Sequence, residues 1–376
     1  MSPGSAVPNK GNPVEQLECR FCPSDVGEVV LDLGAQPAAD HFPPMADPGP
    51  DPLHSLRMWL CARCGLAQLA EDPTTPEEPR GAEPEALARQ ARQAVADVAW
   101  LLPEAGVAAE FGSPHGGSWL GLLAERGLEA AEGPAGGPAD VVVDCFGLMH
   151  DADQRAGLAE RVDRLSADGT LLIQFHSLAA ILAEGQWNAL RHGHYAYYST
   201  PVLVAMLSEF GLVTREAFRY PLYGGTVLLA AGRGGSPGAS VRRVVAQEDA
   251  LGVRSAAALS RLGGLATAGA ESLSAWLRSR PGQAVGYGAA SRAVALLCRA
   301  GVDRSLLPVV ADASPAKQGR RIPGTDIPVG DPGVVLAGPV TALLFLADLL
   351  PEVRQAHPQV DWVLADRGVT EPHEGG

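Results

Sequence analysis

The stretch A-D-V-V-V-D-C-F-G-L-M-H-D-A-D-Q-R-A-G-L-A-E-R-V-D-R-L-S-A-D-G-T-L-L-I-Q-F, residues 139–175, carries clear secondary-structure signals. The apolar run at 139–146 is typical of a buried strand, and 169–175 predicts a second strand. Between them, the pattern at 155–166 predicts a helix. A strand, a helix and a strand in succession are typical of a parallel pair of strands, so this unit predicts an α/β fold.

The same alternation extends outward on both sides of this unit. It predicts further strands and helices, the strands at 107–111, 128–133 and 226–232 and the helices at 86–102, 118–127 and 201–211. Strands that alternate with helices are typical of a parallel, doubly wound sheet. We therefore expect one α/β domain in the middle of the chain.

A second series follows the glycine-rich stretch at 232–240, which is typical of a domain boundary. Apolar periodicity over 241–280 predicts one or two helices. Further βαβ signals lie at 283–291, 292–302, 306–314, 342–347 and 360–365. We expect three units, an N-terminal module at 1–75, a central domain at 76–235 and a C-terminal domain at 236–376.

Four of the six cysteines form two Cys-x-x-Cys pairs, Cys19–Cys22 and Cys61–Cys64. Two such knuckles can place four thiolates around one tetrahedral Zn²⁺ ion. A redox Cys-x-x-Cys needs only one pair, and four unrelated thiols would not be expected in matched pairs. Because four thiolates leave no open position on the metal, we expect a structural zinc. Cys145 and Cys298 lie in apolar runs that are typical of a core.

The composition is that of an ordinary globular protein, 46% hydrophobic and 19% charged, with a net charge of −14. Nucleic acid is not an expected partner, because binding it requires clusters of Lys and Arg. No stretch reaches the ~18 consecutive apolar residues of a membrane span. The N-terminus also lacks the apolar core of a secretory signal. We expect a cytoplasmic protein, in which reduced thiols favour metal over disulfides.

A glycine-rich turn, E-F-G-S-P-H-G-G-S-W-L from Glu110 to Leu120, joins a predicted strand to a predicted helix. Gly112 and Gly116 would let the backbone approach a ligand closely at the helix N-terminus. Such a turn suits an adenosine-type cofactor, and a turn without any ligand is the alternative. Glu132 ends the next strand, where an acidic side chain either binds ribose hydroxyls or is a solvated charge.

The run Q-W-N-A-L-R-H-G-H-Y-A-Y-Y-S-T, residues 186–200, is rich in His and Tyr in a chain only 5% aromatic. Histidine is a natural general base, and tyrosine can both hydrogen-bond and pack against a polar substrate. A surface loop held by aromatic burial is the alternative. We favour a substrate site because loops commonly carry function.

Together these features resemble the sugar C-methyltransferases of deoxysugar pathways in antibiotic-producing actinomycetes. The resemblance covers nearly the whole chain and is most specific in G-Y-G-A-A-S-R at 286–292 and D-A-S-P-A-K-Q-G-R-R-I-P-G-T-D-I-P-V at 312–329. The family shows a similar glycine–alanine turn, then Asp, Pro-Ala-Lys-Gln-Gly and Pro-Gly-x-x-Ile-Pro. It implies a zinc-knuckle domain, a class I methyltransferase-like domain that binds S-adenosylmethionine, and a C-terminal Rossmann-like domain.

The resemblance also implies a reaction. Family members methylate a carbon beside the ketone of a nucleotide-linked 4-keto deoxysugar, by removal of the α-proton and attack of the enolate on the methyl sulfonium. His150 matches the family's strand-end histidine and, with Glu110, Gly112, Gly116 and Glu132, is an implied cofactor contact. Further candidate substrate contacts are Tyr195, Tyr197 and Tyr223, and the contacts for sugar or diphosphate that the resemblance implies are Tyr287, Ser291, Arg292 and Lys317. For the last two, solvated charges are the alternative.

Two departures from the family pattern stand out. The family's active-site loop usually reads Tyr-His-Glu-His, then an aromatic pair and Ser. Here Arg191 replaces the tyrosine and Gly193 the glutamate, while the second histidine is present as His194. The candidate catalytic residues are His194, His192, Arg191 and Tyr198.

The second departure shortens the central domain. The family's glycine loop reads roughly Glu-Ile-Gly-Ser-Asn-Asp-Gly, and this chain lacks the Asn-Asp pair after Ser113. After Glu132 the chain passes almost at once to Ala139, where family members place another strand and helix. The turn of that missing unit normally borders the adenine.

Three hypotheses follow. The first is a methyltransferase that uses S-adenosylmethionine and a nucleotide-linked keto-deoxysugar. The second keeps the sugar site without methyl transfer, so that His194 shuttles an α-proton and Arg191 stabilises the enolate in an epimerase, isomerase or eliminating enzyme. The third is a non-catalytic partner of a related enzyme. In each case we expect the zinc module to shape the mouth of the sugar site rather than react.

Overall fold

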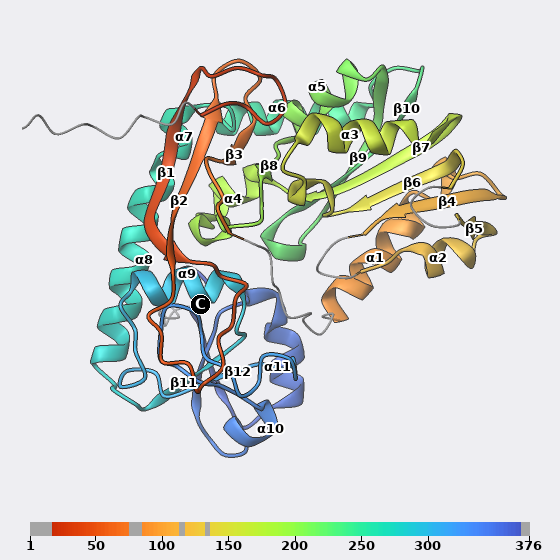
Figure 1. The fold of residues 1–376 in the computed structure, drawn as a ribbon. Coiled ribbons are helices and arrows are strands. Elements are labelled where there is room, and N and C mark those ends of the chain that lie inside the picture. The colour runs from red at the N-terminus through yellow and green to blue at the C-terminus, as the bar shows by residue number, and fades with distance from the viewer. Residues whose placement is uncertain (1–16, 75–84, 113–116, 132–135, 370–376) are drawn as a thin grey trace, which may run out of the picture.

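Three β-sheets organise the chain (Figure 1). The structure is a computed structural model that describes residues 17–74, 85–112, 117–131 and 136–369. The expected α/β class is confirmed, since two of the sheets are built largely from parallel strands joined by helices. The predicted domain limits at 75 and 235 stay predictions. In the described residues, no helix combines the length and the apolar character that crossing a membrane requires.

The N-terminal sheet is antiparallel and has the order β1-β2-β3-β8. Its strands are β1 (Gly27–Pro37), β2 (Leu53–Cys61), β3 (Ala67–Leu69) and β8 (Ala196–Tyr197). The second cysteine knuckle forms the turn between β2 and β3, and Gly65 adopts a φ of 77° there, a conformation that glycine favours. The fourth strand, β8, comes from the middle of the chain and was not predicted.

The central sheet has the order β5-β4-β6-β7-β10-β9. Its strands are β4 (Gly106–Phe111), β5 (Leu128–Ala130), β6 (Ala139–Cys145), β7 (Leu165–His176), β9 (Leu212–Tyr220) and β10 (Thr226–Arg233). The four strands from β5 to β7 are parallel, as expected. The prediction was wrong for β10, which runs antiparallel to both β7 and β9. A short turn joins it to β9, which was not predicted, so no helix reverses the chain between them.

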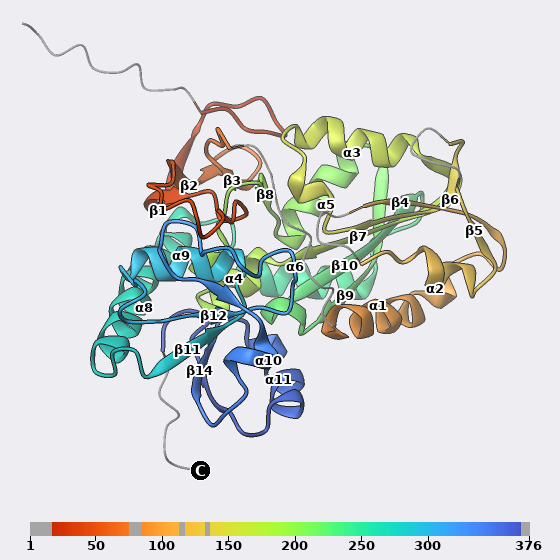
Figure 2. The same ribbon diagram turned by 60° about the horizontal axis from the view of Figure 1, so that its bottom comes forward.

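Helices cover both faces of this sheet. They are α1 (Glu85–Asp97), α2 (Leu120–Ala124), α3 (Gln154–Asp163) and α5 (Thr200–Glu209), whereas α4 (Leu178–Glu184) follows β7 and packs in the core shared by the N-terminal and C-terminal parts. Figures 1 and 2 show α1 and α2 on one side of the sheet and α3 on the other. The connection from β5 to β6 runs only from residue 131 to residue 138, so β5 is the edge strand of the sheet.

The C-terminal sheet is wholly parallel, with the order β13-β12-β11-β14-β15. Its strands are β11 (Ala284–Tyr287), β12 (Val310–Ala311), β13 (Val329–Gly330), β14 (Thr341–Leu344) and β15 (Asp361–Leu364). The helices of this part are α7 (Ala256–Leu259), α8 (Arg261–Arg278), α9 (Ser291–Arg299), α10 (Pro332–Val335) and α11 (Leu350–Ala356), whereas α6 (Ala239–Leu251) packs on β9 and α5 of the central part. The predicted second βαβ series is confirmed.

The N-terminal sheet packs against helices of the C-terminal part (Figure 1). Leu31 and Leu56 of this sheet share one buried core with Leu273 of α8 and Leu296 of α9. Burying a leucine side chain contributes about 1.5–3 kcal/mol, so a few such contacts suffice to hold the two parts together. The zinc-ligand cysteines lie instead in the core of the central sheet. The N-terminal module thus bridges the other two sheets.

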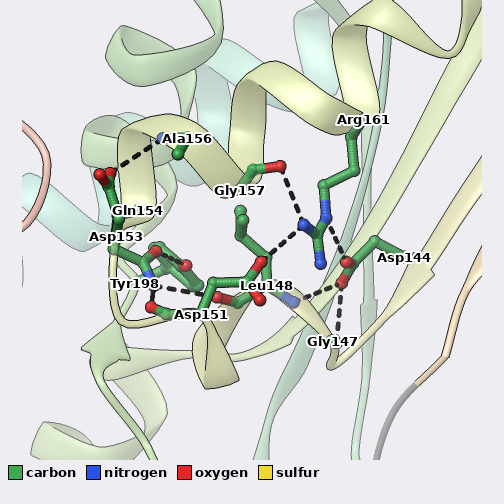
Figure 3. A network of polar contacts seen from close by, with 10 residues as sticks. All are labelled: Asp144, Gly147, Leu148, Asp151, Asp153, Gln154, Ala156, Gly157, Arg161 and Tyr198. Atoms are coloured by element: carbon green, nitrogen blue, oxygen red, sulfur yellow. Dashed lines mark hydrogen bonds and ion pairs between the residues drawn. The ribbon is translucent and has the colours of Figure 1, made fainter.

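A buried ion pair shapes the carboxyl end of β6 (Figure 3). Asp144 accepts hydrogen bonds from the backbone N–H groups of Gly147 and Leu148 at 2.8 and 3.0 Å. Its other oxygen accepts from Arg161 Nε at 2.7 Å, and Arg161 also bonds Asp151 at 2.6 Å. The Asp144 and Arg161 side chains are only 1% and 4% exposed. This network fixes the turn that leads from β6 into α3.

We expect Arg161→Met to lower the free energy of unfolding by about 3–5 kcal/mol, because Asp144 would be left buried without its counter-charge. The matched control is Arg92→Met, which breaks the exposed pair with Glu85. That change should cost about 1 kcal/mol or less. Urea unfolding of the three proteins measures both values. A similar small loss in both variants would contradict the role given to the buried pair.

Candidate functional site

The four knuckle cysteines converge as the sequence predicts. Their Sγ atoms all lie within 4.8 Å of one another, and the Cys19–Cys64 and Cys22–Cys61 pairs are each 3.6 Å apart. Four thiolates at the usual ~2.3 Å from a tetrahedral zinc would be roughly 3.8 Å from each other, so the cluster fits this metal. Because the cysteines would fill the coordination sphere, their expected role is structural. Within the described residues, no other such cluster is present.

The loop 186–200 lies between the zinc module and the carboxyl end of β6. Its strand β8 pairs with β3, with Ala67 opposite Tyr197. The Tyr195 carbonyl accepts from the Leu69 N–H at 3.1 Å, which extends this pairing by one bond. On the other side, the Tyr195 N–H donates to the Met149 carbonyl at 2.7 Å. Met149 belongs to η2 (Leu148–His150), the short helix that follows β6.

Two predicted residues, His150 and His194, meet at this junction. Their ring centroids are 4.7 Å apart and the rings are nearly perpendicular, at 86°. His150 Nδ1 donates to the Gly193 carbonyl at 2.9 Å, and since a carbonyl can only accept, this nitrogen carries a proton. Both histidines are half-buried. The structure thus brings together two imidazoles that the sequence places 44 residues apart (194 − 150).

The two histidines of the loop differ in their surroundings. His192 is 3% exposed, and its Nε2 donates to the Ser55 carbonyl at 3.1 Å. Burial lowers the pKa of His192, which favours the neutral ring. His192 therefore anchors the loop to β2, and His194 is the better candidate for proton transfer. A cavity of about 280 Å³, lined in part by His54, His41 and Asp51, lies beside this anchor.

Arg191 connects three parts of the chain. Its guanidinium lies 2.9 Å from an Asp40 carboxylate oxygen and donates to Ser291 Oγ at 2.8 Å. Its backbone N–H donates to the Tyr197 hydroxyl at 3.0 Å. Arg191 and Ser291, both predicted site residues, are thereby brought into direct contact. The side chain of Arg191 is only 8% exposed, so this arginine holds the loop between the N-terminal and C-terminal parts.

The tyrosines of the loop lie in separate places. Tyr197 is buried beside His194, with ring centroids 6.4 Å apart. Tyr198 is 1% exposed, donates to Gln154 and packs against Phe175, within the network around Asp144 (Figure 3). Burial raises the pKa of the Tyr198 hydroxyl well above its usual range. The structure therefore places Tyr198 in the support of the site, whereas Tyr197 borders the histidine pair.

A second polar cluster lies at the carboxyl end of β7. His176 ends that strand, and its Nε2 donates to Gln186 Oε1 at 2.8 Å while Nδ1 accepts from Arg292 at 3.4 Å. Gln186 in turn donates to the Tyr223 carbonyl at 3.0 Å. His176 was missed in the sequence, although its place at the end of a predicted parallel strand is a signal that could have found it.

Two aromatic residues beside this cluster have unusual backbone conformations. Phe146 after β6 and Tyr223 between β9 and β10 have φ values of 62° and 58°, and they are the non-glycine residues with positive φ in the described chain. Their rings meet edge to face, with centroids 5.7 Å apart. Strained residues of this kind concentrate at functional sites. Predicted contacts Tyr223 and Arg292 therefore share one neighbourhood with His176.

The predicted cofactor edge follows β4. Glu110 accepts from Ser118 Oγ at 2.5 Å and from the Trp119 N–H at 2.6 Å, so its carboxylate holds the start of α2. Among the described residues, no atom lies within 4 Å of a side chain at Gly112, so none of them blocks a ligand from the backbone there. Gly116 and Glu132 lie outside the described residues.

The remaining predicted contacts lie in the C-terminal part. Lys317 is buried, donates to the Ala289 carbonyl at 2.9 Å and lies 4.9 Å from the centre of the Phe42 ring. It therefore ties the turn after β11 to the N-terminal module. Tyr287 packs edge to face on Trp362, with centroids 5.5 Å apart, and burial raises the pKa of its hydroxyl. Neither residue contacts the histidine pair in the described structure.

The cluster at β7 predicts a pH dependence of stability. Burial and then the Arg292 charge lower the pKa of His176 to about 3. An unfolded histidine titrates near pH ~6.5, so between these values the unfolded chain takes up a proton that the folded chain does not. As the pH falls through this window, the free energy of unfolding of the wild type should decrease by up to about 1.4 kcal/mol per pH unit more than that of His176→Gln. Urea unfolding at several pH values measures the difference, and parallel curves would contradict it.

Two known protein families match parts of this chain, one in its N-terminal module and one in its C-terminal part. A family described as "C-methyltransferase C-terminal domain" matches residues 221–362, and one described as "Putative zinc binding domain" matches residues 19–78. The C-methyltransferase NovU of Streptomyces niveus is 22% identical, over 84% of this chain and 86% of its own length.

Solved structures resemble the chain only weakly. Magnesium protoporphyrin IX methyltransferase ChlM from Synechocystis PCC 6803, with bound SAH, is 15% identical over 40% of this chain and 86% of its own, at a TM-score of 0.30. N-methyltransferase NodS from Bradyrhizobium japonicum WM9 is 14% identical over 41% of this chain and 100% of its own, at 0.27. These likenesses are too low to carry weight. The two matched domains and the relative that spans most of the chain show that this protein is similar to C-methyltransferases that carry a zinc-binding domain, and they support a methyltransferase.

Proposed function

We propose that this protein methylates a carbon beside the ketone of a nucleotide-linked keto-deoxysugar, with His194 as the base that removes the α-proton. The observation that carries this proposal is the contact between His194 and His150 at the carboxyl end of β6. In sheets of this kind, ligands bind outside the carboxyl ends of the strands. The similarity to a C-methyltransferase over most of the chain supports the reaction class.

The proton step follows from the chemistry of the pair. His194 is half-buried and belongs to a loop that is hydrogen-bonded on both sides, so its imidazole is held in place. A neutral imidazole can accept a proton, and the ring of His194 meets that of His150 edge to face at a centroid distance of 4.7 Å. His150 is oriented by its bond to the Gly193 carbonyl. We assign it the support of His194 rather than a separate base.

S-adenosylmethionine, when bound, supplies an electrophilic methyl group. Among the described residues, Gly112 would border it, because the end of β4 leaves open space there. Gly116 and Glu132 are proposed to complete that edge. For the substrate, we propose contacts from Ser291 and Arg292 at the first turn of α9, from Tyr197 and Tyr223 beside the two clusters, and from Tyr195, Tyr287 and Lys317.

One observation favours a second function. The strand β5 is the edge of the central sheet, and the chain passes from it to β6 through residues 131–138 alone, which leaves few residues to build a donor site at this edge. A protein with the same base and a weakened donor site would exchange or epimerise the α-carbon without methylation. For the same substrate, this alternative predicts exchange of the α-proton with solvent and no methylated product.

We expect the zinc-loaded chain, incubated in heavy water with a nucleotide-linked 4-keto deoxysugar and S-adenosylmethionine, to form a product one methylene unit heavier. His194→Gln should slow this reaction about 10²-fold or more, since it removes the base. His357→Gln is the matched control, because His357 lies at the end of α11 in the C-terminal part. Mass spectrometry of the sugar measures both outcomes.

The same experiment separates the alternatives. Deuterium at the α-carbon that requires His194, without any methyl transfer, would replace the proposed function with proton transfer alone. If neither deuterium nor methyl enters the sugar, the protein has no such activity on this substrate class and the proposal is wrong.

A further inference from the structure

The first zinc knuckle holds an arginine that reaches the active-site loop. Arg20 follows the zinc ligand Cys19, and the knuckle closes two residues later at Cys22. Its backbone is fixed at both ends, because its N–H donates to Gln68 Oε1 at 2.9 Å and its carbonyl accepts from the Gln154 N–H at 3.1 Å. A metal held by Cys19 and Cys22 would therefore set the position from which the Arg20 side chain extends.

The guanidinium of Arg20 contacts three separate segments. It lies over the ring of Tyr195, 4.7 Å from the ring centre. Its Nε donates to the Leu69 carbonyl of β3 at 3.2 Å, and Nη1 donates to the Ala152 carbonyl after η2 at 3.1 Å. A planar fork that bonds two carbonyls and stacks on an aromatic ring is a geometry that arginine provides and lysine does not.

These contacts surround the residue next to the proposed base. The Tyr195 backbone already bonds Met149 on one side and Leu69 on the other. Arg20 makes a third contact with Tyr195, because its guanidinium covers the Tyr195 ring, and it also donates a hydrogen bond to the Leu69 carbonyl. His194 directly precedes Tyr195, and its ring meets His150, which directly follows Met149. Movement of Tyr195 would therefore change the distance between the two histidines.

We propose that Arg20 is a positioning residue that couples the zinc knuckle to His194. The knuckle fixes the Arg20 backbone, and the Arg20 side chain fixes Tyr195 and with it the adjacent histidine. The catalytic part of this inference rests on the proposed function, whereas the effect on the loop does not. The second knuckle offers a comparison, because its arginine, Arg63, is exposed and lies in the Cys61–Cys64 turn.

Hydrogen–deuterium exchange of the full chain, with zinc content measured in each sample, tests the coupling. In Arg20→Ala, the backbone amides of residues 194–197 should exchange about tenfold faster, because a stacked cation and two charged hydrogen bonds are lost. Arg20→Lys keeps the charge without the fork and should give an intermediate rate. Arg63→Ala removes an arginine from the other knuckle and should leave these amides at the wild-type rate. If Arg20→Ala does not fold, Arg20→Lys against Arg63→Lys makes the same comparison.

Unchanged exchange at 194–197 in a zinc-loaded Arg20 variant would overturn the proposal, as would an equal rise in the Arg63 variant. Where turnover is measurable, kcat of Arg20→Ala should fall about tenfold or more while KM for the sugar nucleotide stays within about twofold. A fall in kcat without faster exchange would also contradict a positioning role. If the wild type shows no turnover at all, the proposed function fails, and the exchange result still decides the coupling.

Discussion

The backbone of Tyr195 is the constraint on which the arrangement of the site depends. Its N–H bonds Met149 at the end of the central sheet, and its carbonyl bonds Leu69 in the sheet of the zinc module. Because one residue satisfies both partners, the two sheets and the loop are fixed relative to one another at this point. The contact between His150 and His194 follows, since these residues directly adjoin Met149 and Tyr195.

The rest of the molecule supports this junction from three directions. The zinc module supplies β3 and Arg20, and it packs on α8 and α9 of the C-terminal part. The buried Asp144–Arg161 pair sets the course of the chain after β6, from which His150 comes. Arg191 joins the loop to Asp40 and Ser291. A metal held by the four cysteines would fix the segment beside β3, with which the loop pairs, and in the proposed function it would act on the site only through this pairing.

Much of this could be predicted from local patterns. The paired cysteines predicted the metal cluster, and apolar periodicity predicted most strands of both parallel sheets. What was missed depends on long-range pairing. Ala196 and Tyr197 form a strand only because β3 is present to receive them, and β10 is antiparallel because β9 leads into it through a short turn. The end of a predicted strand marks His176, but its partner Arg292 lies 116 residues away, so the contact between the two could not be predicted from local sequence. The separate roles of His192 and His194 likewise follow from burial, which adjacent sequence does not reveal.

The proposed function requires that S-adenosylmethionine binds beside Gly112, at the end of β4. Calorimetric titration of the zinc-loaded chain with S-adenosylmethionine and S-adenosylhomocysteine tests it most directly. We expect one saturable site per chain, lost in Gly112→Leu, a change that the fold should tolerate because no atom of the described residues lies within 4 Å of a Cβ at that position. The absence of binding by either compound to the wild type, or full binding by Gly112→Leu, would contradict it.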